Sequence, residues 1–154
     1  MKLKLEQLRP YLSVYLSDGY RQDELALDAV EVEQGKISAN LKVINYFMPG
    51  DGRFHFTAPL AFIWVAQLAI IYTCWEHDLS EKPGEIYLRE IHLQTRKMIN
   101  KTENISLILK VTKKRYLVNG TVYYTGSIDI DNGAFWGEGK FVSPLPTSII
   151  QDRL

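Results

Sequence analysis

Residues 58–75 form an almost uninterrupted apolar stretch, in which the only clearly polar members are Gln67 and Thr73. A helix that is apolar all round must be buried. Its length is at the lower limit for crossing ~30 Å of hydrocarbon. Pro59 at its start, Gln67 in its middle and the lack of a flanking basic cluster argue against a membrane span. We therefore expect a helix buried in protein, where the Gln67 amide needs a partner.

Strand patterns lie on both sides of this helix. Before it, residues 23–33 and 36–47 alternate apolar and polar side chains around a turn at Gln34-Gly35, which predicts a hairpin. After it, Asn119-Gly120 and Asn132-Gly133 are typical of hairpin turns. The segments between these signals predict about four more strands in an antiparallel meander, over residues 86–99, 105–112, 117–130 and 134–142.

About six antiparallel strands need one face covered, and a single apolar helix can be wrapped by a curved sheet. The predicted fold class is therefore α+β, with a long central helix inside a curved sheet, which is the hot-dog arrangement. We expect one domain over residues 1–146, beginning with a short helix near residues 3–12, and a peripheral C-terminal tail over residues 147–154.

Composition excludes several classes of function. The chain has 18 basic and 18 acidic residues, so it lacks the basic excess of a nucleic-acid binder. The first residues do not read as a signal peptide, and a single cysteine, Cys74, cannot form an internal disulfide. We expect a cytoplasmic protein. No metal site is expected, because His77 and His92 lack the spacing of metal ligands to nearby carboxylates.

The segment His55-Phe56-Thr57-Ala58, followed by Gln67-Leu68-Ala69, resembles the His-Phe-Asn-Ala and Asn-Gln-Leu-Ala segments of FcoT-like long-chain fatty acyl-CoA thioesterases, at equal spacing. Leu8-Arg9-Pro10-Tyr11 is similar to that family's Leu-Glu-Pro-Tyr, and Gly137-Glu138-Gly139 to its Ser-Gly-Glu. More distantly, the chain resembles hydroxyacyl-carrier-protein dehydratases, in which His-Phe-Pro precedes the hot-dog helix. The resemblance implies a hot-dog fold and acyl-thioester chemistry.

The chain departs from the family at two functional positions. The family's tyrosine six residues before the histidine is Pro49 here, and its asparagine before the glutamine is Ala66. The early tyrosine is matched by Tyr11, and Tyr46 is a possible substitute for the missing one. The dehydratases use a helix Asp or Glu, and residues 59–75 contain neither.

Thioester hydrolysis needs donors for an oxyanion and a group that activates water. His55 stands just before the helix and is suited to act as general base, beside helix N–H groups that can hold an oxyanion. Gln67 cannot transfer protons but can orient a substrate or water. The candidate catalytic residues are thus His55, Gln67 and Tyr11. The candidate substrate-binding residues are Thr57, Ala58, Tyr46, Phe47 and Trp64.

Each candidate catalytic residue also has a purely structural interpretation. His55 can instead anchor its loop, Gln67 can pair with a backbone carbonyl or with Gln67 of a second subunit, and Tyr11 can simply pack on the sheet. Lys110, Lys113, Lys114 and Arg115 can keep a hairpin edge soluble, or they can contact coenzyme A phosphates or an acidic acyl carrier protein.

The sequence therefore predicts an acyl-CoA or acyl-carrier-protein thioesterase that works as a homodimer or higher even oligomer. It needs no cofactor besides the coenzyme A or phosphopantetheine of its substrate. A dehydratase-like enzyme and a non-catalytic acyl-binding or carrier-binding module are the alternatives. Release of free thiol from a panel of acyl thioesters distinguishes the first from the others.

Overall fold

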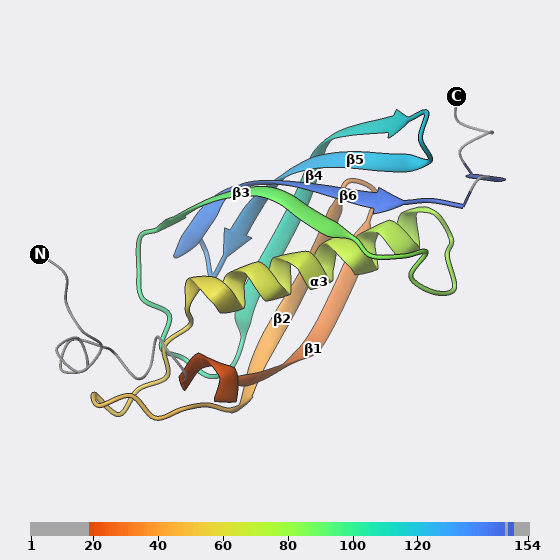
Figure 1. The fold of residues 1–154 in the computed structure, drawn as a ribbon. Helices are drawn as coiled ribbons and strands as arrows, with labels where there is room; N and C mark the ends of the chain where they lie inside the picture. The colour runs from red at the N-terminus through yellow and green to blue at the C-terminus, as the bar shows by residue number, and fades with distance from the viewer. Residues whose placement is uncertain (1–18, 147, 150–154) are drawn as a thin grey trace, which may run out of the picture.

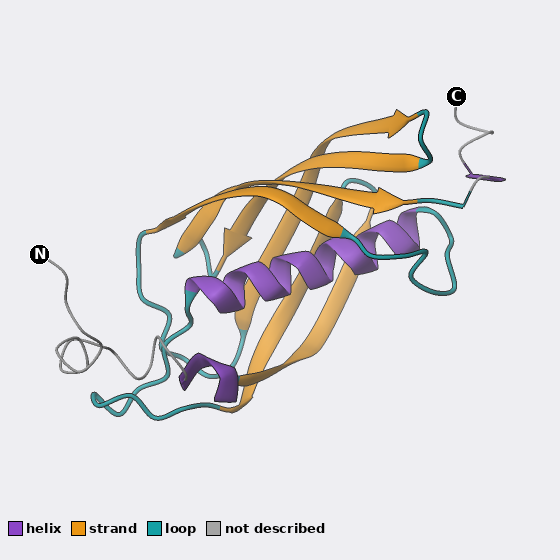
Figure 2. Cartoon of the chain, viewed as in Figure 1, coloured by secondary structure: helices purple, strands orange, loops and turns teal. Residues whose placement is uncertain are grey.

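The computed structural model describes residues 19–146 and 148–149, which form one antiparallel sheet and one long helix. Figures 1 and 2 show the helix lying along the concave face of a curved sheet. The predicted helix near residues 3–12, Tyr11 and most of the predicted tail lie outside the described residues. In chain order the elements are η2 (Gly19–Gln22), β1 (Glu24–Glu33), β2 (Lys36–Asn45), α3 (Ala58–Glu76), β3 (Tyr87–Thr95), β4 (Ile105–Leu117), β5 (Thr121–Ile130) and β6 (Phe135–Pro144).

The strands follow the order β1-β2-β4-β5-β6-β3, and every neighbouring pair is antiparallel. This confirms the predicted fold class, a long helix on a curved sheet of six strands. The predicted simple meander is wrong at one point, because β3 does not pair with β4. Strand β4 already has β2 on one side and β5 on the other, so β3 lies at the far edge beside β6.

The turn signals mark the right places; the β1–β2 loop has the two expected residues, and the two later loops are longer. Gly35 (φ +78°) turns β1 into β2, and residues 118–120 and 131–134 connect the last three strands. Asp131, Asn132 and Gly133 all have positive φ, a conformation that Asp, Asn and Gly tolerate best. Strand β4 runs five residues beyond the predicted end at residue 112, through a bulge between Val111 and Lys113.

The core lies between α3 and the concave face of the sheet. One side of the helix is buried, and it meets the inward side chains of β2, β4, β5 and β6. On β6 these positions include Gly137, where a Cβ would lie only 1.7 Å from the carbonyl oxygen of His92, so no other residue fits beside β3.

The expectation that the helix is buried all round is wrong. Phe62, Ile63 and Trp75 are exposed, Ile63 to 56%. Gln67, one turn after Ile63, is exposed as well, so it does not need the buried partner that we expected. The sheet curves around only one side of the helix, and the other side faces out of the chain. By length and composition alone, α3 is also the one described helix that could cross a membrane.

Candidate active site at the helix entrance

The loop before α3 places a histidine beside a carboxylate. His55 Nε2 lies 2.7 Å from Asp51 Oδ2. Asp51 Oδ1 accepts a hydrogen bond from the backbone N–H of Arg53 at 3.1 Å, which fixes the carboxylate within its own turn. The hydrogen bond from His55 lowers the pKa of Asp51. A carboxylate that holds one imidazole nitrogen orients the ring and stabilises the imidazolium, as in hydrolases that use histidine as a base.

Thr57 begins the helix without capping it. Its backbone is extended, as at an N-cap, and its carbonyl accepts the first helical bond from Ala61 N at 3.0 Å, yet its side chain makes no capping bond. The residue is only 9% exposed, and Thr57 Oγ1 is buried without a hydrogen-bond partner. An unsatisfied buried hydroxyl costs on the order of 1–3 kcal/mol. Because Thr57 Oγ1 has almost no accessible surface, it can donate to a ligand only after a small movement of the surrounding side chains.

An open pocket of about 500 Å³ joins these groups. His55, Thr57 and Ala58 line it from the helix entrance, and Arg96 and Lys97 line it from the segment that follows β3. The first-turn N–H groups of a helix have no intrahelical partner and carry partial positive charge. A helix N-terminus at an open pocket that two cationic residues border suits an oxyanion or an anionic substrate group.

The structure brings together three of the predicted site residues: His55, Thr57 and Ala58. Tyr46 and Phe47 lie in the same loop but do not line this pocket. The ring of Tyr46 packs edge-to-face on Phe54 at 5.4 Å, and the N–H of Phe47 donates to Asp23 Oδ1 at 2.9 Å.

The helix residues of the predicted site lie further away. Trp64 is half-buried against the core, and Gln67 is exposed on the outward face. At 1.5 Å per residue, Gln67 is roughly 14 Å along α3 from its first residue. Neither side chain lines the pocket at His55. A catalytic role for Gln67 stays a prediction, as does one for Tyr11.

Sequence reasoning missed Asp51, Arg96 and Lys97. Asp51 was detectable, because it stands four residues before His55 in a loop whose glycines allow a tight turn. The cations were not, because they reach the pocket only through the pairing of β3 with β6. There, Arg96 N and Lys97 N both donate to Ala134 O, and the Arg96 guanidinium lies 4.7 Å from the Trp136 ring centre.

A second polar cluster lies at the opposite end of α3, around Glu76. Glu76 Oε1 accepts hydrogen bonds from Tyr72 OH and Lys114 Nζ, each at 2.9 Å, and Glu76 Oε2 accepts one from Tyr124 OH at 2.6 Å. His77 Nε2 lies 2.8 Å from Tyr124 OH, and Gly35 N donates to Tyr72 OH at 3.1 Å. The carboxylate thus ties the helix to the β1–β2 turn, β4 and β5.

Hydrogen bonding dominates the electrostatics of this cluster. Burial alone would raise the pKa of Glu76, but the bonds from Tyr124, Lys114 and Tyr72 outweigh it and lower that pKa. Burial, together with the neighbouring Glu76, raises the pKa of Tyr72 to about 12 and raises that of Tyr124 further. The cluster therefore holds an ionised carboxylate between neutral phenols, and none of the pockets described here opens onto it.

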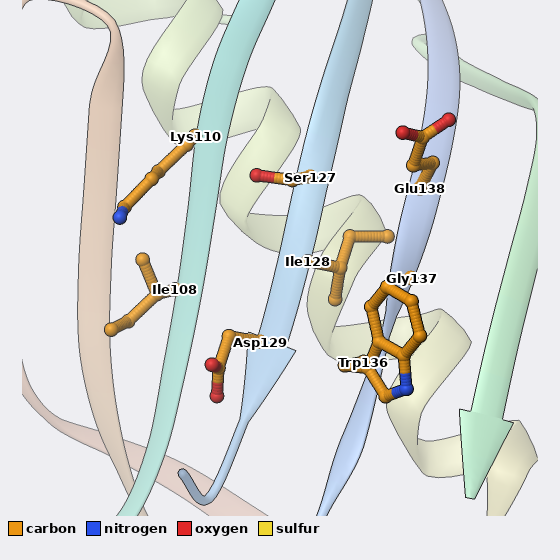
Figure 3. A pocket seen from close by; sticks show the side chains of 8 residues that line it. All are labelled: Ile108, Lys110, Ser127, Ile128, Asp129, Trp136, Gly137 and Glu138. Atoms are coloured by element: carbon orange, nitrogen blue, oxygen red, sulfur yellow. The ribbon is translucent and has the colours of Figure 1, made fainter. Parts of the chain in front are cut away.

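A smaller pocket of about 230 Å³ lies on the outer face of the sheet. Figure 3 shows Lys110, Ser127, Asp129 and Glu138 on the side of β4, β5 and β6 turned away from α3. The four side chains stand apart along three strands rather than pointing at one position. This arrangement offers no nucleophile–base pair, so the helix entrance is the better candidate for chemistry.

Comparison with known proteins identifies the fold. No family model and no curated protein sequence matches the chain. Among solved structures, it is similar to a dehydratase heterocomplex, ApeI:P, from Xenorhabdus doucetiae, with a TM-score of 0.53 and 14% identity over 82% of this chain and 86% of that one. It is also similar to a putative thioesterase from Shewanella oneidensis, with a TM-score of 0.51 and 14% identity over 92% and 97%. At this identity the likeness establishes the fold alone, so the chain has the hot-dog fold.

Proposed function

We propose that this protein hydrolyses an acyl thioester of coenzyme A or of an acyl carrier protein at the entrance of α3. The observation that carries the proposal is one pocket that contains a carboxylate-bound histidine, a buried unpaired hydroxyl and a helix N-terminus. A base and oxyanion donors in one open pocket are what acyl transfer to water requires. The FcoT-like resemblance around His55 supports the same chemistry.

In this mechanism His55 is the general base and Asp51 is a positioning residue. The Asp51 carboxylate holds Nε2 and so orients the imidazole ring. Water attacks the carbonyl carbon, and its proton passes to His55. The resulting oxyanion is stabilised by Thr57 Oγ1 and by the N–H of Ala58 or Leu60, since Pro59 has none. The C–S bond then breaks, and the thiolate takes the proton from His55, which leaves a carboxylic acid and a free thiol.

Dehydration is the weaker alternative. It needs a helix acid beside the histidine, and the acid that α3 does contain, Glu76, stands at its far end and is held by Tyr72, Tyr124 and Lys114. Binding without turnover stays open as an outcome of the experiment below.

The test is release of free thiol from acyl-CoAs of increasing chain length and from acylated carrier protein. Wild type should release thiol, and His55→Ala should lose at least about 100-fold in kcat/KM, since general base catalysis contributes about 10²–10⁴. His55→Gln keeps a hydrogen-bond donor but cannot transfer a proton. It should lose as much as the alanine variant.

No thiol release across the panel by a folded protein would sink hydrolysis. Binding of the same thioesters without release would point to a binding module, and interconversion of 3-hydroxyacyl and enoyl thioesters would point to a dehydratase. Equal activity of His55→Gln and wild type would leave His55 as a loop anchor only.

A second copy of the chain fits the exposed side of the molecule. Strand β3 pairs with β6 on one edge, and its other edge pairs with no strand of the described residues. The outward face of α3 presents Phe62, Ile63 and Trp75. An open strand edge and an apolar helix face both favour association. Gln67 lies on this face, where the Gln67 of a second subunit could satisfy it. The proposed enzyme is therefore a homodimer.

Size-exclusion chromatography with light scattering tests the proposed homodimer. Wild type should have at least twice the mass of the 17.7 kDa chain, and Ile63→Glu should lower it. The matched control is Ile44→Glu on β2, because Ile44 is exposed to 55% and Ile63 to 56%. A monomeric wild type, or the same mass loss in both variants, would contradict the proposed interface.

A further inference from the structure

The end of the sheet nearest the β4–β5 hairpin carries a groove on its outer face. The groove has a volume of about 580 Å³. Tyr87 pairs with Val142, which pairs with Tyr123, so these three side chains stand in one row. The next residues along two of these strands, Tyr124 and Phe141, are buried against the core. Because strand side chains alternate between faces, the row points away from α3.

The groove combines an apolar floor with two phenols. Leu117, Val142 and Pro144 supply apolar surface, and Tyr87 is 61% exposed. At the hairpin tip beside it, Val118 is 88% exposed. Exposed tyrosines next to a concave apolar surface are typical of protein-recognition sites, where they bury area and hydrogen-bond at once.

The surroundings of the groove are cationic. Arg89 lines it, and Arg115 stands beside it, opposite Tyr123 on the neighbouring strand. Lys113 faces the same side, one pair further along β4. All three are exposed, and none forms an ion pair with a described residue.

The charges closest to these cations are already paired. Lys140 Nζ lies 2.6 Å from Glu90, and the groove's own carboxylate, Glu85, lies 2.7 Å from Lys82 Nζ. This leaves Arg89, Lys113 and Arg115 as a local excess of positive charge around the groove.

The structure divides the basic run that the sequence presents as one group. After the bulge, Lys114 points inward to Glu76, whereas Lys113 and Arg115 point outward. Lys110 lies outward as well, but in the smaller pocket of Figure 3. Only part of the run can therefore contact a partner at the groove.

We infer that this groove docks an acidic segment of a partner protein, in which apolar side chains alternate with carboxylates. The apolar side chains would lie between Leu117, Val142 and Pro144, and the carboxylates would meet Arg89 and Arg115. Concavity and mixed polarity favour a peptide over a flat anionic membrane. Three free cations in a chain of zero net charge are too few for a nucleic-acid track. The inference does not depend on the proposed function.

The test uses a fluorescein-labelled copolymer of glutamate and tyrosine as the probe, followed by fluorescence anisotropy with the full chain. We expect saturable binding that weakens as salt increases, because the rim contacts are charge pairs. Arg115→Glu should weaken binding about tenfold, and Tyr123→Ala should weaken it in a variant whose circular dichroism matches wild type. The matched control is Lys110→Glu, the same charge change on the same face of β4 but outside the groove.

Three results would overturn the inference. The first is no saturable binding of the copolymer. The second is equal weakening by Lys110→Glu and Arg115→Glu, which would indicate attraction to the sheet face as a whole. The third is binding to vesicles of phosphatidylcholine and phosphatidylglycerol, or to an oligothymidine, that is tighter than to the copolymer and equally dependent on Arg115. In that case the groove would serve a membrane or a nucleic acid instead.

Discussion

The buried polar groups at the two ends of α3 differ: those at the C-terminal end are hydrogen-bonded, and the hydroxyl at the N-terminal end is not. At the C-terminal end, Glu76 receives three hydrogen bonds from Tyr72, Tyr124 and Lys114 in a largely buried setting. At the N-terminal end, Thr57 Oγ1 is buried without a partner, and a pocket of about 500 Å³ opens beside His55. The hydrogen bonds of Glu76 hold one end of the helix on the sheet, whereas the Thr57 hydroxyl at the other end makes no hydrogen bond.

This difference separates stability from function along one element. A satisfied buried network stabilises a unique arrangement, whereas an unsatisfied group lowers stability unless a ligand completes it. Substitutions at the Glu76 end should therefore change the free energy of unfolding and leave catalysis intact. Substitutions at the His55 end should do the reverse.

The largest effect on stability is expected for Glu76→Ala. Removing the carboxylate leaves two phenols and the Lys114 ammonium without their acceptor, which should lower the free energy of unfolding by about 2–3 kcal/mol, a value reduced because Lys114 is partly exposed. Urea unfolding measures it. Among folded molecules kcat should stay within about twofold of wild type, and a large loss of kcat would break the division between the two ends.

Asp51→Asn should have the opposite effect to Glu76→Ala: it should lower activity and leave the free energy of unfolding unchanged. Asparagine replaces the carboxylate that orients the His55 ring with a neutral amide, so kcat/KM should fall roughly tenfold or more, while the urea midpoint stays unchanged because Asp51 is exposed. A fall in stability as large as that of Glu76→Ala would show that Asp51 is structural. An unchanged kcat/KM would remove its role as a positioning residue.

Local patterns predicted most of the fold, because each strand and turn has its own signal. The alternation in β2, with Ile37 and Leu41 inward, and the glycine turns needed no tertiary information. The position of β3 beside β6 did need tertiary information, because it depends on β4 being already paired with β2 and β5. The exposure of Gln67 could not be predicted either, since an all-apolar helix does not reveal which side the sheet will cover.

The candidate site was half-visible in the sequence. His55, Thr57 and Ala58 are neighbours in the chain, so a helix start was enough to group them. Arg96 and Lys97 lie about forty residues further on and join the pocket only through strand pairing. The Glu76 cluster was invisible for the same reason, since its tyrosines and its lysine come from α3, β4 and β5.

The pH dependence of stability tests the Glu76 end without removing any atom. Since the folded pKa of Glu76 is lowered below its ordinary value of 4.5, its contribution is complete above that value and is lost as pH falls through the folded pKa. Wild type should therefore lose more stability than Glu76→Gln between pH 6 and pH 3, by urea unfolding at each pH. Parallel curves for the two proteins would mean that the carboxylate is not held in its ionised form.

The smallest effect, and the one of opposite sign, is expected for Thr57→Val. Valine keeps the shape of threonine and removes a hydroxyl that has no partner and caps nothing, so the free energy of unfolding should rise by up to about 1 kcal/mol. At the same time kcat should fall, because the oxyanion loses a donor. Thr57→Ser, which retains the hydroxyl, should keep most of the activity. A Thr57→Val protein that is less stable than wild type would show that the hydroxyl already serves the fold. The two ends of the helix would then not differ in the way described.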